Sequence, residues 1–199
     1  GIYSADPRGV ADARQLAELP LDGALALAGG GAKVLLADAL LHARSLGVTL
    51  RATSTQQAAG TGTSLPPGPV PEAVVGIAAD HQLRAVLQAT GGPALPWSGV
   101  ARAWIPVDGG MRVLVDTRNL PDPSTWCLPD GLTDMGSAAT LTAVGREAVS
   151  DPSIVQAAVS ALQEHGLVRW WAVGNTFCAE VEPACLEQAQ SALHRALIR

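Results

Sequence analysis

The sequence predicts an α/β protein in two parts, and three observations support this fold class. Two helical patterns and a strand pattern come first, a glycine- and proline-rich stretch follows, and strands then alternate with amphipathic helices. The 199 residues, of which 48% are hydrophobic, are enough to bury a core in one or two domains. We therefore expect a folded chain with many loops.

The first part predicts an α/β segment. Leucine and alanine recur at helical spacing on both sides of the glycine triplet 29–31, and Gly47 stands where a second helix would be capped. The four prolines near residue 70 favour an extended linker. In order, we expect a helix over 21–28, a helix over 33–46, a half-buried strand over 48–53, a polar loop over 54–64 and the linker over 66–72.

The second part opens with two strand patterns, 73–79 and 83–90, that form either one bent strand or a hairpin. We then expect a short helix over 97–105, a turn over 108–110, a strand over 111–116 and an irregular excursion over 121–136. The remainder predicts a strand over 140–144, a helix over 151–165 with Ser150 as cap and Pro152 early, strands over 167–173 and 176–181, and a helix over 182–197.

The last five elements follow a β-α-β-β-α order. Such an order packs as a small antiparallel sheet with its helices on one face, the ferredoxin-like layout. Residues 73–116 show a shorter version of the same order of strand and helix patterns, which indicates two related modules, the first of them eroded.

Composition excludes several classes of partner and site. The net charge of -5, the pI near 5.2 and the absence of a basic run argue against nucleic acid and against an anionic membrane surface. The apolar stretches are shorter than the roughly 20 residues of a membrane span. An odd number of cysteines favours the cytoplasm, and scattered histidines predict no protein metal site. The chain begins without methionine or a signal-peptide pattern, so we expect a cut or processed start.

One cation stands out, because Lys33 is the single lysine beside twelve arginines. A genome rich in arginine codons would explain that ratio by itself. However, Lys33 follows the glycine triplet, where backbone can approach a ligand or a helix can begin with free N–H groups. Free N–H groups at a helix start favour phosphate.

Three motifs, in this order, resemble those of the aspartokinase family. They are Gly1-Ile2-Tyr3-Ser4-Ala5-Asp6-Pro7-Arg8, similar to the run that closes the family's nucleotide site; Gly31-Ala32-Lys33-Val34-Leu35, similar to GAKVLHPR; and Arg51-Ala52-Thr53-Ser54-Thr55 with Gly62-Thr63, similar to the end of the kinase domain. Residues 72–78, 141–145 and 192–197 resemble parts of the family's ACT modules. The resemblance covers nearly the whole chain.

This resemblance implies an α/β fold with the end of an amino-acid-kinase (carbamate-kinase-like) domain over 1–65, the linker over 66–72 and a degenerate tandem of ACT modules over 73–199. It also implies a nucleotide site. Tyr3 would stack on the adenine of ATP, Arg8 and Lys33 would contact its phosphates, and Mg²⁺ would arrive with the nucleotide. Asp6 is expected to orient the loop rather than bind a metal. The alternatives without a ligand are that Tyr3 is a surface aromatic, Arg8 a solvated charge and Lys33 an exposed helix start.

The chain also departs from the family pattern. Leu36-Ala37-Asp38 replaces His-Pro-Arg after the lysine motif, and the effector loop over 145–152 lacks the family's glycine-methionine pair. Arg146 and Asp151 are either contacts for the charged ends of an amino-acid effector or ordinary loop charges. The lysine- and serine-bearing segment at the front of the kinase has no counterpart here, so we expect no catalytic residue in this chain.

The leading functional hypothesis is the C-terminal portion of an aspartokinase, which phosphorylates aspartate with ATP only together with a missing N-terminal kinase part. The alternative is a non-catalytic regulatory subunit that pairs with a partner and binds an amino acid or no ligand. A third reading keeps the kinase fold and changes the carboxylate substrate. We expect a homodimer or hetero-oligomer through the ACT sheets, with Trp170 or Trp171 at the interface, because neighbouring strand residues face opposite ways.

Overall fold

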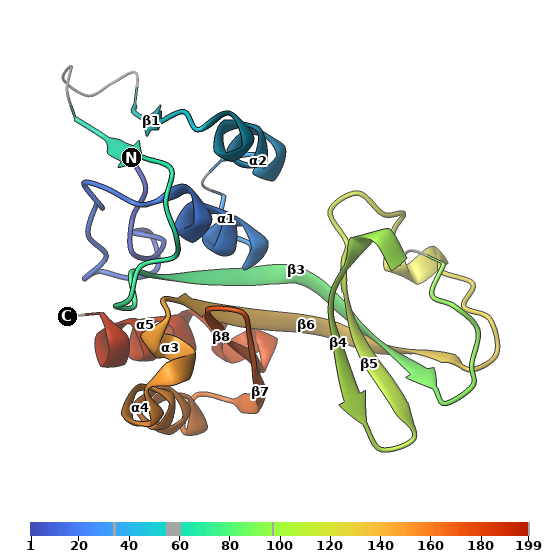
Figure 1. Ribbon diagram of the computed structural model, residues 1–199. Helices are drawn as coiled ribbons and strands as arrows, with labels where there is room; N and C mark the ends of the chain where they lie inside the picture. The colour runs from blue at the N-terminus through green and yellow to red at the C-terminus, as the bar shows by residue number, and fades with distance from the viewer. Residues whose placement is uncertain (34, 55–60, 97, 199) are drawn as a thin grey trace. The chain divides into compact units, whose positions relative to one another are not determined.

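The computed structural model describes residues 1–33, 35–54, 61–96 and 98–198 (Figure 1). The chain forms two compact units. Unit 1 comprises Gly1–Asp80 and Thr140–Arg199, and unit 2 comprises His81–Ala139. Unit 1 thus contains the expected kinase end together with the second expected module. The expected domain boundaries at residues 65 and 72 stay a prediction.

The N-terminal segment of unit 1 is held by backbone pairing. Residues 2–4 run antiparallel to 14–16, with Ser4 N donating to Arg14 O at 2.9 Å and Leu16 N donating to Ile2 O at 2.9 Å. The Thr63 hydroxyl joins both, because it accepts from Ile2 N at 2.7 Å and donates to Leu16 O at 2.7 Å. Nothing in the sequence predicts this pairing.

Four elements follow: α1 (Leu21–Gly29), α2 (Ala37–Leu46), β1 (Leu50–Ala52) and β2 (Thr63–Leu65). The predictions of α1 and of the Gly47 cap are confirmed, since Gly47 has a φ of 65°. The predicted start of the second helix at Lys33 is wrong, because Leu36 is extended and the helix begins at Ala37. The predicted loop over 54–64 is wrong at its end, where β2 pairs antiparallel with β1; residues 55–60 of that loop lie outside the described residues.

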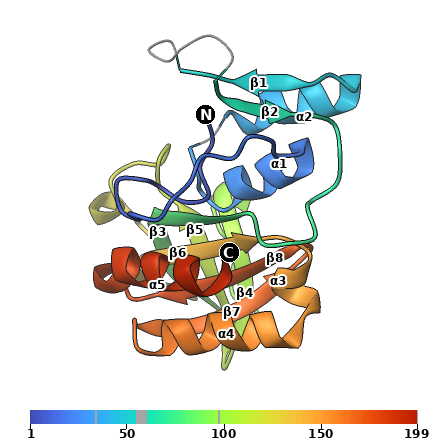
Figure 2. The same cartoon turned by 90° about the vertical axis from the view of Figure 1, so that its left-hand side faces the viewer.

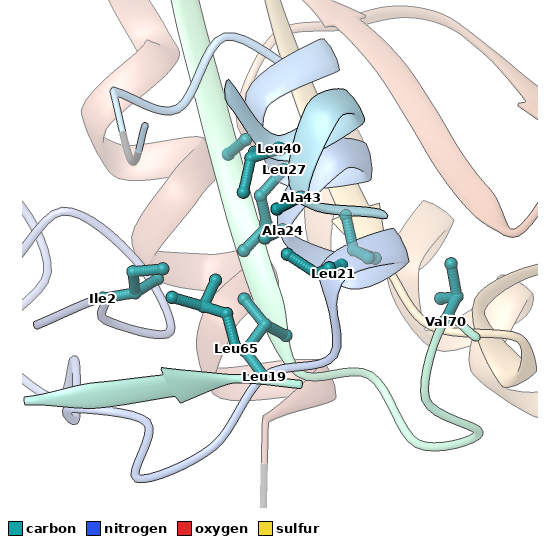
Figure 3. Close-up of a cluster of buried hydrophobic side chains, with 11 residues drawn as sticks. Ile2, Leu19, Leu21, Ala24, Leu27, Leu40, Ala43, Leu65 and Val70 are labelled. Carbon is teal, nitrogen blue, oxygen red and sulfur yellow. The ribbon is translucent and has the colours of Figure 1, made fainter. Parts of the chain in front are cut away.

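Figure 3 shows the core that these elements share. Leu21, Ala24 and Leu27 of α1 meet Leu40 and Ala43 of α2. The same buried cluster also contains Ile2, Leu19, Leu65, Val70, Ala78 and Val144. It therefore joins the helical segment to the first residues of β3 and the last residues of β6.

The strands of the larger sheet are β3 (Gly76–Ala89), β4 (Ala101–Val107), β5 (Gly110–Asp116), β6 (Leu132–Val144), β7 (Leu167–Val173) and β8 (Thr176–Val181). Their hydrogen-bonded order is β4-β5-β3-β6-β8-β7. In both views α4 (Pro152–Gln163) and α5 (Leu186–Leu197) lie on one side of β6 and β8, and α1 lies on the other (Figures 1 and 2). This confirms the ferredoxin-like arrangement expected for the last five elements.

Two short helices adjust that arrangement. The α3 helix (Glu147–Ser150) was not predicted, and η3 (Pro183–Cys185) precedes α5, so the last α-helix starts later than residue 182. The predicted cap Ser150 is wrong: Asp151 caps α4 by accepting from Ser153 N at 2.8 Å. Pro152 is the first residue of α4, as predicted.

Unit 2 consists of strands and short 3-10 turns. The residues from 83 to 89 of β3 pair with β5, and β5 pairs with β4 across the predicted turn at Asp108 and Gly109. The predicted helix over 97–105 is wrong in the described part, where η1 (Ser98–Val100) leads into β4; residue 97 lies outside the described residues. The two strand patterns around residue 81 form one strand, not a hairpin. The predicted excursion over 121–136 contains η2 (Pro123–Thr125) and is wrong from Leu132, where β6 begins.

Among the helices that the structure describes, none is long and apolar enough to cross a membrane. Within the described ranges, histidine, cysteine and acidic side chains do not gather in a group of three that could bind a metal ion. Cys127, Cys178 and Cys185 are free thiols, and Cys178 is buried.

Candidate functional site

The loop after the first paired segment is organised by Asp6. Its backbone carbonyl accepts from Gly9 N at 3.1 Å and Val10 N at 2.9 Å, and its carboxylate accepts from Arg8 N at 3.0 Å. The loop between Ser4 and Val10 is thus a compact turn with Asp6 at its centre. These are the orienting contacts expected of Asp6 from the sequence.

Arg8 forms a two-pronged ion pair with the same carboxylate. Its Nη2 lies 2.6 Å from Asp6 Oδ2 and its Nε lies 3.0 Å from Oδ1. The Arg8 guanidinium holds the pKa of Asp6 below its ordinary value, and Asp6 raises the pKa of Arg8. The Arg8 side chain is 85% exposed, and such surface pairs contribute little to stability. Arg8 can therefore leave Asp6 for a stronger anion at small cost.

Lys33 belongs to the same charged region. It is exposed in the loop between α1 and α2, and its ammonium is near enough to contribute to the lowered pKa of Asp6, after the larger effects of Arg8. Tyr3 is half-buried in the paired segment that precedes the loop and forms an isolated β-bridge with Gln15. The structure thus brings Asp6, Arg8 and Lys33 into one electrostatic neighbourhood, with Tyr3 three residues before Asp6.

The glycine triplet before Lys33 rests directly on the larger sheet. A Cβ on Gly30 would lie 2.7 Å from Thr142 Cβ, and one on Gly31 would lie 2.5 Å from Asp80 Cβ. Gly31 also has a φ of +99°, which side chains rarely adopt. The need for glycine here is therefore a close approach between the loop that carries Lys33 and the strands β3 and β6.

The predicted effector residues have other contacts. Asp151 accepts from the backbone N and the Oγ of Ser153, at 2.8 and 2.7 Å, and so begins α4. The Arg146 side chain is 51% exposed and lies 3.6 Å from Glu72. These contacts fit the reading of both groups as structural charges, and an effector role for Arg146 and Asp151 stays a prediction.

Polar side chains on α5, which the sequence does not predict as functional, contact the N-terminal segment and the start of β3. His194 Nε2 lies 2.8 Å from Ser4 Oγ, Gln190 Nε2 donates to Ile77 O at 3.2 Å, and Ser191 Oγ donates to Gly9 O at 3.2 Å. Their spacing along a helix places them on one face. A signal was present, since His194 and Gln190 interrupt the buried face of an amphipathic helix, but the sequence does not indicate their partners.

The tryptophans of β7 differ in exposure. Trp170 is 46% exposed and stacks on Phe177 with ring centroids 5.6 Å apart, whereas Trp171 is half-buried. Exposed Val168 and Val173 lie on the same strand, which ends the strand order of the sheet. An interface at these residues stays a prediction.

The sequence matches no protein-family model and no curated protein. Among solved structures, Escherichia coli aspartokinase III in complex with aspartate and ADP matches with a TM-score of 0.82 and 18% identity, over 100% of this chain and 50% of that one. Aspartate kinase from Clostridium acetobutylicum matches with a TM-score of 0.74 and 16% identity, over 99% of this chain and 52% of that one. The chain shares the fold of aspartokinases. It spans about half the length of the aspartokinases it matches.

The same E. coli enzyme in complex with lysine and aspartate matches with a TM-score of 0.75, again over 100% of this chain. The match to aspartokinases thus includes both the segment with the charged loop and the β-α-β-β-α region. At identities of 16–18% these matches establish the fold alone.

Proposed function

We propose that this chain is the C-terminal, regulatory portion of an aspartokinase-type enzyme and contributes nucleotide contacts to a kinase site that an N-terminal part completes. The reaction would be the ATP-dependent phosphorylation of the aspartate side-chain carboxylate. The observation that carries the proposal is the agreement of fold over the whole chain, together with the electrostatic effect of Lys33, from the loop between α1 and α2, on Asp6, which pairs with Arg8 in the N-terminal turn. The proposal keeps the cytoplasm as the location of the protein, as expected from the odd number of cysteines.

The residues of these two loops suit a nucleotide. Two cations, Arg8 and Lys33, are exposed near one carboxylate, and Arg8 is held by a surface ion pair that a phosphate can replace. Tyr3 offers a flat side chain for the adenine. ATP would bring Mg²⁺ with it, and the chain's own part is to hold and orient the phosphates, since the groups that act on the γ-phosphate would come from the N-terminal part.

A surface of unit 1 fits the docking of that N-terminal part. Helix α2 buries only Leu40 and Ala43, and Leu36 is 80% and Leu46 61% exposed. Other exposed apolar side chains around the helix are Leu35, Leu41 and Val48. Exposed apolar side chains gathered on and beside one helix indicate an interaction surface. The matched aspartokinases are about twice as long as this chain, so the N-terminal part of such an enzyme is the partner we propose for this surface.

Native mass spectrometry of the protein purified from its source, followed by ADP·Mg²⁺ titration of the same sample, tests this proposal. We expect either a longer polypeptide or a second, larger chain, and nucleotide binding by that assembly. Copies of the 199-residue chain alone, with no nucleotide binding, would refute the kinase reading.

Lys33→Ala tests the assignment of Lys33 to the nucleotide site. We expect the affinity for ADP·Mg²⁺ to fall about tenfold, equivalent to about 1.4 kcal/mol, because a phosphate contact is lost. Arg112→Ala on β5 removes an equal charge from unit 2 and serves as the control. Equal affinities for Lys33→Ala and Arg112→Ala would remove Lys33 from the site.

One observation favours the second candidate, a non-catalytic regulatory subunit. Asp38 is exposed in the first turn of α2, where an acid repels a phosphate that approaches this helix terminus. Asp38→Asn separates the two readings. A rise in nucleotide affinity supports a working site that Asp38 weakens, and an assembly that binds no nucleotide with either residue supports the subunit.

A further inference from the structure

His194 is a buried titratable group to which the proposed function gives no role. Only 3% of its surface is exposed, and its Nε2 lies 2.8 Å from the hydroxyl of Ser4, which is fully buried. The two residues are 190 positions apart in the sequence. The pair therefore fastens the last helix of the chain to its first few residues.

The Ser4 hydroxyl is the point where this contact acts on the loop. Ser4 Oγ accepts from the backbone N of Arg14 at 3.1 Å, and the backbone N of Ser4 donates to Arg14 O at 2.9 Å. A hydroxyl has one proton to donate, and the neutral imidazole Nε2 can accept it. In this arrangement His194 completes the hydrogen bonding of Ser4 and fixes the rotamer with which Ser4 holds Arg14.

Two neighbours on α5 reinforce the same segment. Gln190 donates to Ile77 O, while Ile77 N donates to Ser4 O at 2.7 Å. Ser191 donates to Gly9 O at the far end of the Asp6 turn. Helix α5 thus contacts the loop at its beginning and at its end, with Asp6 and Arg8 between the two contacts.

We propose that His194 is a positioning residue for the N-terminal segment Gly1–Val10 and its Asp6 loop, which it holds by a hydrogen bond to Ser4 so that Tyr3, Asp6 and Arg8 are presented to the nucleotide. The ordering of the loop does not depend on the proposed function, whereas the consequence for nucleotide binding rests on it. The last helix of the regulatory region then acts directly on the nucleotide loop.

The contact depends on a neutral imidazole. Burial lowers the pKa of His194; Asp12 opposes this with a smaller effect, and Arg14 adds to it. A group that binds a proton less readily in the folded state contributes stability above its unfolded pKa of about 6.5. That contribution is lost as the pH falls through the lower folded value. Protonation would place a charge in the buried contact and loosen Ser4.

Amide hydrogen exchange of the full chain, measured by NMR, tests the ordering. We expect His194→Leu to lower the protection of the Ser4, Arg14 and Leu16 amides at least tenfold, and His194→Gln to restore most of it, since the glutamine amide can bond to Ser4. His81→Gln, at an exposed histidine of unit 2, is the control. The protection of these amides in the parent chain should fall between pH 7 and 5, and the Gln variant should not show this fall.

Unchanged protection in His194→Leu, or equal pH profiles for the parent chain and His194→Gln, would overturn the positioning role. ADP·Mg²⁺ titration of the source assembly then separates the two proposals. Nucleotide affinity that falls about tenfold in His194→Leu supports both, and unchanged affinity with lost protection overturns the presentation of the loop to nucleotide. An assembly that binds no nucleotide contradicts the proposed function, while the exchange data still decide the role of His194.

Discussion

The two ends of strand β6 show how differently the two units are built. From Ala138 to Val144 every residue is buried, whereas from Thr133 to Ser137 exposed and half-buried residues alternate. In unit 1 the strand is covered on both sides, by α4 and α5 on one and by the glycine triplet and α1 on the other. One strand therefore serves as the centre of one unit and as a half-buried strand of the other.

The largest effect should come from truncating a core side chain in the buried end of β6. Leu141→Ala removes a side chain with no exposed surface, and we expect a loss of about 2–5 kcal/mol in the free energy of unfolding because a cavity remains. Met135→Ala, at a residue 50% exposed on the same strand, should change it by less than about 0.5 kcal/mol. Urea unfolding followed by circular dichroism measures both, and similar losses would contradict the difference between the two ends.

The second prediction concerns the cover that the glycine triplet gives to the sheet of unit 1. Gly31→Ala introduces a Cβ at 2.5 Å from Asp80 Cβ in a backbone conformation with φ +99°, so we expect a loss of about 1–3 kcal/mol. Gly29→Ala is the matched control, since nothing lies within 4 Å of its Cβ, and it should stabilise α1 by about 0.5–1 kcal/mol. The melting temperatures of the two variants should therefore shift in opposite directions, and a stabilising Gly31→Ala would refute the close contact.

The third prediction uses a tripeptide that occurs once in each unit. Asp151-Pro152-Ser153 and Asp122-Pro123-Ser124 make the same contacts, with the aspartate accepting from the serine N at 2.8 and 2.9 Å. The first begins the twelve-residue helix α4 and the second a 3-10 turn of three residues. Asp151→Ala should cost about 1 kcal/mol of unfolding free energy, as for a lost helix cap. Asp122→Ala should leave the unfolding midpoint unchanged, and equal effects would mean that the cap matters no more in α4 than in the turn.

This pair also explains what the sequence could predict. A cap signal is local, so it locates the start of α4 to within one residue, at Ser150 instead of Asp151, but the length of the helix depends on the apolar face that follows. The sequence predicts a strand over 140–144 because every residue there is β-branched or apolar, and it predicts none over the preceding residues of β6, because Asp134, Gly136 and Ser137 resemble a loop. Their pairing partners lie far away in the sequence.

The candidate site also has residues that short motifs predict and features that the sequence does not predict. Tyr3, Asp6, Arg8 and Lys33 were identified because each stands in a short motif. The helix start at Ala37 and the ion pair that holds Arg8 were not, since both depend on the conformation of a loop. His194 and Ser4 lay beyond reach for another reason, because nothing in either sequence neighbourhood indicates a partner 190 residues away.

The smallest effect is expected in unit 2, where an ion pair ties β3 to β6. Arg84 lies 2.6 Å from Asp134 and its guanidinium lies 6.0 Å from the Trp126 ring. Both charged side chains are partly exposed, so Arg84→Met should cost no more than about 1 kcal/mol at neutral pH. Arg146→Met, whose partner Glu72 lies 3.6 Å away on the surface of unit 1, should have no measurable effect.

Lowering the pH tests whether Arg84 stabilises unit 2 through its charge. Arg84 lowers the pKa of Asp134, so the carboxylate contributes stability above its unfolded pKa of about 3.9 and loses it as the pH falls through the lower folded value. The cost of Arg84→Met should therefore shrink as the pH is lowered from 5 toward 2, while the cost of Leu141→Ala, which involves no titrating group, should persist. Unfolding midpoints across this range decide it, because an Arg84→Met cost that stays constant would show that Arg84 acts by packing on Trp126 rather than through its charge.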